Sequence, residues 1–282
     1  MKKPELLAPA GSALSAMAAY DAGADAIYAG LPKFNARERG ENFKIIEHFH
    51  KGNRKVYVTM NTIVKQSELP EVAEYLALLD QMHPDALIVQ DMAYLRMGLP
   101  IELHASTQTF NATAEQVAFM ADCGLKRVVL ERNLSLADIR TIAEQTEAEL
   151  EVFVHGAVCV GYSGRCFLSR SMGPRSGNRG DCMQACRLSW DLEDASGRKL
   201  LREKHLLSVC DMDLSERIGD LLDAGVCSFK IEGRLKDRTY LRNIVSHYRR
   251  ILDHHITQRT DCQRASVGNS TIEFEPNPAK SF

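Results

Sequence analysis

The chain has 282 residues, 45% of them hydrophobic and 26% charged, which is the composition of a globular protein that buries a full core. Its formal net charge is -2, so the chain as a whole is not a polycation that coats nucleic acid, and any RNA contact needs a local basic patch. No stretch reaches the apolar length of a membrane span, and the N-terminus lacks the apolar run of an export signal.

Short apolar runs alternate with amphipathic stretches along most of the chain. The runs predict eight strands near residues 5–11, 26–30, 55–61, 86–90, 101–106, 127–131, 150–155 and 228–232. The stretches predict helices near residues 13–21, before 52, and near 69–82, 93–97, 112–123, 136–146, 214–224 and 239–253. This alternation indicates a (β/α)8 TIM-like barrel over residues 1–253. An open doubly wound sheet is the alternative, but no G-x-G-x-x-G motif follows the first strand.

One long segment interrupts the alternation after the seventh strand. Between His155 and Arg187, glycines and a proline predict irregular backbone, and four cysteines have the spacing C-x6-C-x15-C-x3-C. These cysteines are Cys159, Cys166, Cys182 and Cys186. A hairpin-like stretch, Ser189 to Lys204, follows before the chain returns to the barrel. In a barrel this loop, residues 155–210, lies at the carboxyl ends of the strands, where active sites form.

The four cysteines favour a metal centre over ordinary buried thiols, because glycine, arginine and serine flank them instead of an apolar face. A cytosolic location is expected, and there reduced thiols are better explained as metal ligands than as disulfides. Structural zinc usually uses C-x2-4-C pairs, and only Cys182 and Cys186 have that spacing. An all-thiolate set at irregular spacing suits an iron–sulfur cluster at least as well, so both metals remain open.

Polar side chains stand at the predicted carboxyl ends of several strands, where a barrel assembles its active site. His104 and His155 are candidate acid–base groups, although each could equally be a satisfied core histidine. Basic residues concentrate in the cysteine segment and after the last strand, as a phosphate-binding surface requires, although the second group could be a solvated helix face. The candidate catalytic residues are His104, Glu232 and Arg234, and the candidate substrate-binding residues are Asn35, Asn61, Gln108, Arg165 and Lys230.

After Asp253 the sequence becomes polar. Residues 254–282 are therefore expected to be a linker and the start of a further region, with a strand-like stretch from Thr271 to Glu275. The abrupt end after this stretch predicts that the chain is part of a longer protein.

Four motifs resemble the collagenase-like peptidase family: His155-Gly-Ala-x-Cys159, Tyr162-Ser-Gly-Arg-Cys166, Gly180-Asp-Cys-x-x-x-Cys186 and Lys230-Ile-Glu-Gly-Arg234. The stretches 88–92, 102–108, 178–182 and 203–208 are most similar to RNA-hydroxylating members, which form 5-hydroxycytidine in 23S rRNA or 5-hydroxyuridine in tRNA. The resemblance implies oxygen-independent, prephenate-dependent 5-hydroxylation of a cytidine in 23S rRNA, with tRNA uridine hydroxylation as the alternative. It also implies an iron–sulfur cluster, expected as 4Fe–4S, on the four cysteines. Arg165, Lys230 and Arg234 are candidates for a prephenate carboxylate or an RNA phosphate.

Two rival classes of function remain. A metal-assisted or thiol peptidase is the first, but the sequence has no H-E-x-x-H motif and no recognisable pairing of a Ser or Cys nucleophile with a base. A cluster-bearing scaffold without catalysis is the second. A scaffold would tolerate the loss of His104, Glu232 and Arg234, whereas a hydroxylase requires at least some of them. The oligomeric state has no signal in the sequence.

Overall fold

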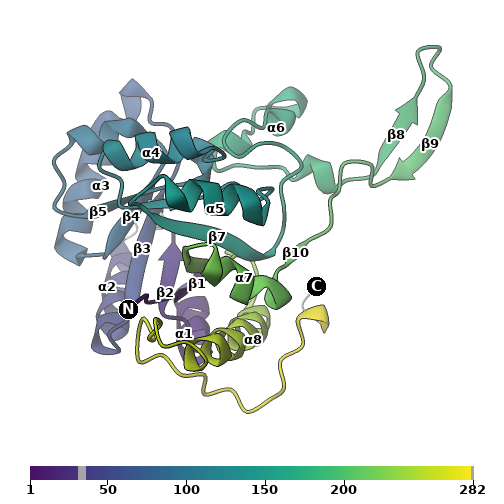
Figure 1. Ribbon diagram of the computed structural model, residues 1–282. Helices are drawn as coiled ribbons and strands as arrows, with labels where there is room; N and C mark the ends of the chain where they lie inside the picture. Colours follow the sequence, from purple (N-terminus) through teal and green to yellow (C-terminus); the bar gives the residue numbers. More distant parts are fainter. Residues whose placement is uncertain (31–35, 281–282) are drawn as a thin grey trace.

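The computed structural model describes residues 1–30 and 36–280, which form a closed barrel of parallel strands surrounded by helices (Figure 1). The barrel strands are β1 (Glu5–Ala10), β2 (Ala26–Ala29), β3 (Lys55–Met60), β4 (Ala86–Val89), β5 (Glu102–Ala105), β6 (Arg127–Val129), β7 (Glu149–Gly156) and β11 (Val226–Ile231). Each pairs in parallel with the next in this order, and β11 pairs with β1 to close the ring. The predicted (β/α)8 barrel is confirmed.

Four of the helices that cover the barrel, α1, α4, α5 and α8, begin at a capping side chain. The Ser12 hydroxyl accepts a hydrogen bond from the Ser15 amide at the start of α1, and Thr113 forms a capping box with Gln116 before α4. A 3-10 helix, Met92–Arg96, takes the place of an α-helix after β4. The α-helices are α1 (Ala13–Asp21), α2 (Ala36–Lys51), α3 (Leu69–Met82), α4 (Ala114–Asp122), α5 (Leu136–Glu144), α6 (Leu168–Met172), α7 (Ile218–Asp223) and α8 (Arg238–Thr257).

The insertion after β7 contains a hairpin that projects from the barrel at the upper right of Figure 1. Its antiparallel strands are β8 (Trp190–Glu193) and β9 (Lys199–Lys204), as the sequence predicts. A short strand, β10 (Met212–Asp213), then pairs antiparallel with β7 and returns the chain to the barrel. The cysteine segment is mostly irregular but includes the single-turn helix α6.

The segment after α8 packs on the barrel instead of extending away from it. The helix continues past Asp253 to Thr257, and the Ser266 hydroxyl then donates a hydrogen bond to Asp25 at 2.6 Å. The Thr271 amide bonds the Asp21 carbonyl at 2.8 Å, and Ile272 is buried. The expected strand from Thr271 to Glu275 is wrong, because these residues join no ladder and are held by contacts to α1 and α8.

The barrel interior contains charged side chains, and these form the base beneath the rim of the barrel. Arg127 bonds Glu5 at 2.5 Å and Glu149 at 2.6 Å, and it lies 3.4 Å from Glu151. Lys230 bonds the other oxygen of Glu151 at 2.7 Å. Because side chains alternate along a strand, these residues face inward while their neighbours pack under the helices. The apolar part of the interior is Leu7, Ala26, Tyr28, Tyr57, Ala86 and Ile88.

Candidate functional site

The carboxyl ends of the eight parallel strands meet at one end of the barrel, and the cysteine segment lies on this rim. Glu131 lies two residues after β6, His155 lies near the end of β7, and Glu232 directly follows β11. Parallel pairing brings these ends together although they are far apart in sequence. The side chains on this rim are therefore the candidates for a functional site.

A partly buried ion pair joins two neighbouring parts of this rim. Arg132 Nη2 lies 2.9 Å from Glu232 Oε2, and its guanidinium carbon is 3.9 Å from the centroid of the Phe153 ring. The Arg132 side chain is 8% exposed and that of Glu232 is 29% exposed, so the carboxylate faces the opening. Gly156, with φ of +103°, lets β7 pass Glu232 closely, since a Cβ there would lie 3.0 Å from the Glu232 Cβ. Arg132 was not among the residues predicted from the sequence, although it is a polar residue shortly after a strand and could have been found by that signal.

Glu131 holds the cysteine segment on the rim. Its carboxylate accepts hydrogen bonds from the Ser163 hydroxyl at 2.9 Å and the Ser163 amide at 3.2 Å, and both residues are buried. At the next residue, Gly164, φ is +72° and a Cβ would lie 2.0 Å from the Gln108 carbonyl oxygen. Only glycine allows this approach. The cysteine segment is thus docked by a carboxylate and a close backbone contact.

The two cations predicted after the last strand differ in their surroundings. Arg234 reaches across the rim and donates a hydrogen bond to the Thr59 hydroxyl at 3.0 Å. Lys230 lies below the rim, 4% exposed, with its ammonium bonded to Glu151 and 4.4 Å from the centroid of the Tyr28 ring. Burial lowers the pKa of Lys230, and the Glu151 carboxylate partly opposes that shift. The expectation that Lys230 lies on the rim is corrected, because its charge already has a partner inside the barrel.

The two candidate acid–base histidines are both buried and hydrogen-bonded. His104 is 1% exposed, its Nε2 lies 2.8 Å from Glu102 at the start of the same strand, and it packs against Tyr57 inside the barrel. The expectation that His104 lines the rim is therefore wrong, since its partner lies toward the amino ends of the strands. His155 Nδ1 lies 3.3 Å from the Tyr248 hydroxyl, and burial lowers the pKa of this histidine.

Two side-chain amides at the rim have a buried oxygen that accepts no hydrogen bond from the described residues. Gln90 Nε2 donates to the Gln108 carbonyl at 3.1 Å, but the side-chain oxygens of both residues are buried and accept no hydrogen bond within the described parts of the chain. A buried acceptor without a donor is costly unless a ligand supplies one. Asn61 Nδ2 lies 3.5 Å from the Ser106 hydroxyl and joins the same group. Asn35 lies outside the described residues.

Arg165 lies in an aromatic group on the same rim. Its guanidinium carbon is 4.6 Å from the centroid of the Phe110 ring, and the Phe110 and Tyr162 ring centroids are 4.8 Å apart. Tyr162 is 59% exposed. The two rings meet edge to face, at an interplanar angle of 61°. Exposed aromatic rings beside a guanidinium are suited to hold a planar, electron-rich group such as a nucleobase. Neither ring was among the predicted site residues, because neither stands at the end of a strand.

All four cysteines of the segment are free thiols. Partial desolvation raises the pKa of Cys159, and the nearby charges of Glu232, Cys182 and Cys186 add to that shift while Arg132 opposes it. Cys159 thus lies within electrostatic reach of two other cysteines and of the rim ion pair. Across residues 1–30 and 36–280, however, no group of three or more His, Cys, Asp or Glu side chains is arranged to hold a metal ion.

Hydrogen-bond donors surround one of these thiols. The Gln184 amide donates to Cys182 Sγ at 3.3 Å, and the Ser169 hydroxyl lies 3.9 Å from the same sulfur. Amide-to-sulfur hydrogen bonds of this kind are typical around sulfur-ligated metal centres. The donor chemistry fits a thiolate-bound cluster, although the thiols are not closed into one coordination shell.

The basic surface predicted for the cysteine segment is smaller than its arginine count indicates. Three of its arginines have acidic partners: Arg175 with Asp181, Arg179 with Glu68 and Arg187 with Asp211. Arg187 also bonds the Val158 carbonyl at 2.8 Å and the Ser208 hydroxyl at 3.1 Å, so it ties the two ends of the insertion together. These arginines serve mainly to shape the loop.

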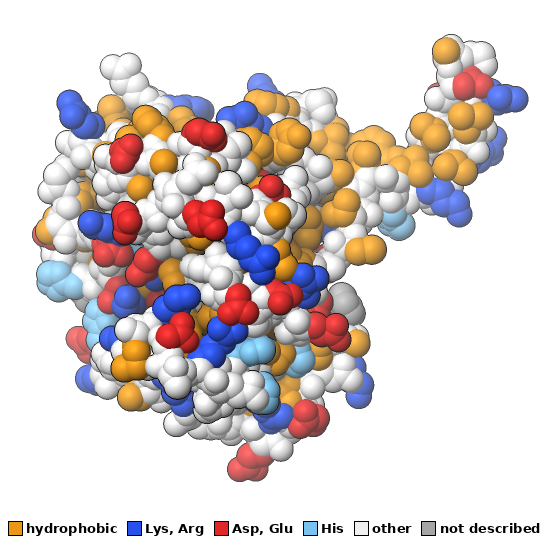
Figure 2. All heavy atoms as spheres, viewed as in Figure 1, with side chains coloured by type: hydrophobic (Ala, Val, Ile, Leu, Met, Phe, Trp, Pro, Cys, Tyr) orange, Lys and Arg blue, Asp and Glu red, His pale blue; other side chains and the backbone are white. Residues whose placement is uncertain are grey.

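The insertion also exposes apolar side chains. Figure 2 shows hydrophobic side chains along the projecting hairpin and its base. Exposed hydrophobic residues in this region are Val160, Tyr162, Phe167, Met172, Leu188, Leu192, Leu200, Leu201, Leu206 and Leu207. Within the described residues, no helix has both the length and the apolar character needed to span a membrane.

The family described as peptidase family U32 matches residues 11–275. The chain is 47% identical over 284 residues to the 23S rRNA 5-hydroxycytidine C2501 synthase of Escherichia coli K12, covering 99% of this chain and 44% of the synthase. It is 36% identical to tRNA hydroxylation protein P1 of Bacillus subtilis 168, covering 89% of this chain and 64% of that protein. The chain thus spans less than two thirds of either relative.

One solved structure supports the fold independently. The U32 peptidase Mk0906 superposes with a TM-score of 0.52 at 12% identity, over 83% of this chain and 94% of that chain. At this low identity the likeness shows the shared barrel and carries no information on activity.

Proposed function

The chain belongs to peptidase family U32, and from this membership and the geometry of its rim we propose that it is the barrel of an RNA hydroxylase. The proposed reaction is the oxygen-independent, prephenate-dependent 5-hydroxylation of a cytidine in 23S rRNA, assisted by an iron–sulfur cluster. The name of the Escherichia coli relative supports a ribosomal RNA cytidine as the substrate. Reduced thiols are consistent with a cytosolic setting for this reaction.

The observation that carries the proposal is the group of aromatic, cationic and amide side chains gathered around the loop that follows β5. Phe110, Tyr162 and Arg165 form a surface on which an unstacked base can lie. The unpartnered amide oxygens of Gln90 and Gln108 can accept hydrogen bonds, which the exocyclic amine of cytosine donates. A base must leave its stack to reach such a site, so the target nucleotide is extruded or unpaired.

We propose that Cys159, Cys166, Cys182 and Cys186 hold the cluster beside this group of side chains. A bound iron–sulfur cluster would supply one-electron transfer or a rigid anchor for the loop. The hydrogen-bond donors near Cys182 and the position of Cys159 near Arg132 support this assignment. Ligand binding by all four thiols requires the loop to tighten relative to the geometry seen here.

Prephenate carries two carboxylates, and we propose that guanidinium groups on the rim bind them. Arg234 and Arg165 are the candidates, since among the described residues Arg234 bonds only a neutral hydroxyl and Arg165 contacts an aromatic ring. Lys230 is a weaker candidate because Glu151 neutralises it. Glu232 and Arg132 would orient the reacting groups between these sites.

The RNA activity is tested in cells that lack the gene. Wild type or Glu232→Gln is expressed from a plasmid, and nucleosides of 23S rRNA and tRNA are analysed by mass spectrometry. Wild type is expected to restore 5-hydroxycytidine in 23S rRNA, whereas Glu232→Gln restores little, because the variant loses the ion pair with Arg132. Glu144→Gln on the exposed face of α5 is the control and should behave as wild type.

The nucleosides also decide between the alternatives. Restoration of 5-hydroxyuridine in tRNA would support the alternative substrate, which the name of the Bacillus subtilis relative favours. Unchanged RNA together with cleavage of collagen peptides by purified protein would overturn the hydroxylase and support a peptidase.

The cluster is tested by anaerobic purification followed by iron, sulfide and zinc assays. About four iron and four sulfide per chain are expected, with broad visible absorption near roughly 400 nm. Cys182→Ala should lose both, while Cys210→Ala, an exposed free cysteine outside the set of four, should keep them. One zinc and no sulfide would instead make the loop a structural zinc site and contradict the proposed cofactor.

A further inference from the structure

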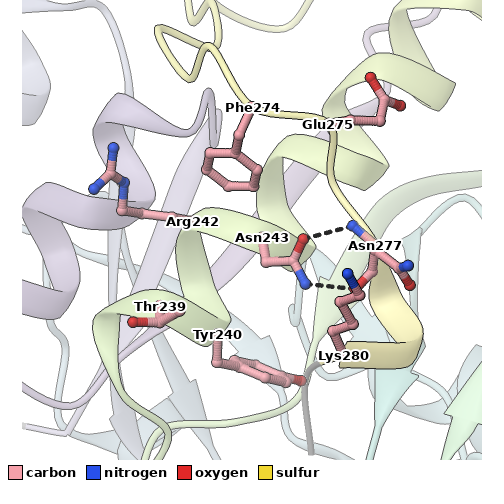
Figure 3. Close-up of a pocket in the computed structure, with 8 residues that line it drawn as sticks. All are labelled: Thr239, Tyr240, Arg242, Asn243, Phe274, Glu275, Asn277 and Lys280. Carbon is pink, nitrogen blue, oxygen red and sulfur yellow. Dashed lines mark hydrogen bonds between the residues drawn. The ribbon is translucent and has the colours of Figure 1, made fainter.

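A second cavity lies on the outside of the barrel, between the start of α8 and the segment that follows this helix. Its volume is about 320 Å³. Figure 3 shows the side chains that line it: Thr239, Tyr240, Arg242, Asn243, Phe274, Glu275, Asn277 and Lys280. None of these residues belongs to the rim site described above.

Two sets of hydrogen bonds fix the walls of this cavity. Asn243 Nδ2 donates to the Asn277 carbonyl at 2.7 Å, and the Asn277 amide donates back to Asn243 Oδ1 at 2.7 Å. About two helical turns further along α8, Arg250 donates to the Phe274 carbonyl at 2.9 Å and pairs with Glu275 at 2.8 Å. The segment is thus held at both ends of the cavity, so the opening is built into the fold.

The ring of Phe274 is left partly uncovered by this arrangement. Although its backbone is anchored, the side chain is 41% exposed and points from the segment toward α8 (Figure 3). The Tyr240 ring forms the opposite wall and is itself buried. An anchored backbone with a half-exposed aromatic ring over a cavity offers a surface on which a further ring can stack.

The charges around the cavity favour an anionic ligand. Glu275 is neutralised by Arg250. Arg242 and Lys280 line the cavity, are exposed, and have no acidic partner within the described part of the chain. Arg238 lies one turn before Arg242 on the same face of α8 and is likewise exposed and unpaired among the described residues.

A single side chain connects this cavity to the rim. The Tyr240 hydroxyl donates a hydrogen bond to the Glu232 carbonyl at 2.8 Å, while its ring lines the cavity. Lys236 Nζ lies 5.4 Å from the centroid of the same ring, and it too has no acidic partner in the described ranges. The unpaired cations Lys236, Arg238 and Arg242 therefore lead from the rim to the cavity.

We infer that this cavity binds a nucleotide of single-stranded RNA that flanks the nucleotide held at the rim. The base stacks on Phe274, and the phosphates contact Arg242 and Lys280. Stacking on an aromatic ring beside a positively charged groove is how proteins hold single strands without reading their sequence. The inference rests on the proposed RNA substrate and adds a second contact region to it.

The test measures binding, separately from hydroxylation. A fluorescent single-stranded RNA of about 12 nucleotides, within the usual footprint of such sites, is titrated with the chain and followed by anisotropy. Phe274→Ala is expected to weaken binding about 5- to 100-fold, the loss typical of one stacked base, and Phe274→Tyr should restore it. Phe119→Ala on α4, at 57% exposure, is the matched control and should bind as wild type.

The phosphate contact is tested through salt dependence. Arg242→Gln is expected to reduce the slope of log affinity against log salt by about 0.7, the value for one phosphate contact of a single strand. Arg140→Gln on α5, also an exposed arginine, should leave the slope unchanged.

Three results would overturn the inference. The first is wild-type affinity in both Phe274→Ala and Arg242→Gln with normal thermal unfolding. That result would show that the cavity does not bind RNA, whereas the nucleoside assay tests the proposed function independently. The second is an absence of RNA binding by the wild-type chain. The third is a concentration-dependent association of the chain that Phe274→Ala abolishes, which would make the cavity a protein contact.

Discussion

Arg132 is the residue on which the rim geometry depends most. Its guanidinium bonds Glu232 at 2.9 Å, contacts the Ser163 hydroxyl at 3.4 Å and stacks on Phe153. One planar group thus connects the last strand, the cysteine segment and β7. A lysine keeps the charge but cannot make these contacts together.

We therefore expect Arg132→Lys to lower the yield of 5-hydroxycytidine about tenfold or more, as misplacement of a positioning group does. The expected cause is lost orientation of Glu232 and not lost charge. Nucleoside analysis of complemented cells measures the effect, with the exposed Arg140→Lys as control. Full activity of Arg132→Lys would show that the pair with Glu232 is not required.

Single residues were the least predictable part of this protein. Glu232 and Arg234 lie on the rim as expected, because they lie one and three residues after the end of the last strand. His104 and Lys230 also stand near strand ends in the sequence, yet their polar atoms bond Glu102 and Glu151 inside the barrel. The position of a residue in the sequence predicts which strand carries it, but the direction of a long side chain depends on which partner lies within reach.

The cysteine segment is an element that the barrel must hold in place. Its contacts include the pair of bonds from Ser163 to Glu131 and the close approach of Gly164 to the Gln108 carbonyl. Both contacts lie between two ligands of the proposed cluster, Cys159 and Cys166. Docking of the loop and placement of these thiols are therefore coupled.

Gly164→Ala is expected to release this segment from the rim. The added Cβ would lie 2.0 Å from the Gln108 carbonyl oxygen, which no backbone there can accommodate without moving. Faster proteolysis of residues 160–187 and a lower iron content per chain would report the change. Gly98→Ala is the control, because Gly98 has a similar positive φ of +64° but open space around it.

Both substitutions carry the cost of about 1 kcal/mol or more for a left-handed non-glycine residue, so their difference isolates the clash. Equal proteolysis and iron content in the two variants would contradict the role given to the loop contact.

Strands and hairpins were predictable because their signals are local. Apolar runs located all eight barrel strands, and the turn-rich stretch after Arg187 located the hairpin. The segment after Asp253 was not predictable, since its order comes from contacts such as Ser266 with Asp25, which lie far apart in sequence. A polar composition alone cannot distinguish a linker from a segment that packs through hydrogen bonds.

The molecule as a whole is built around charges buried inside its barrel. Burial raises the pKa of Glu151, but Lys230 and Arg127 outweigh burial and hold it below the usual value. Glu5 is shifted in the same direction, since Arg127 again outweighs burial. These carboxylates are ionised more readily in the folded protein than in the unfolded chain.

A carboxylate with a lowered folded-state pKa contributes stability above its unfolded value of 4.5, and the contribution is lost as pH falls through the folded value. We expect the urea midpoint of wild type to fall between about pH 6 and pH 3 for this reason. Glu151→Gln should lower stability at pH 6 by about 3–5 kcal/mol, because it leaves Lys230 without its buried partner.

The same variant should also show a weaker dependence on pH, while Glu144→Gln at an exposed site should match wild type. Urea unfolding at several pH values measures both effects. An unchanged pH dependence in Glu151→Gln would show that this network does not govern acid stability.

The order of elements and the family could be read from the amino acids alone, because apolar periodicity and closely spaced motifs are properties of short stretches. The partners of those residues could not, because they depend on which strand ends meet when the barrel closes. Closure joins Arg132 to Glu232 and Phe110 to Arg165, turns Lys230 and His104 inward, and lays residues 258–280 across α8. Contacts between residues far apart in the sequence, set by packing and charge pairing, decided how the site is arranged.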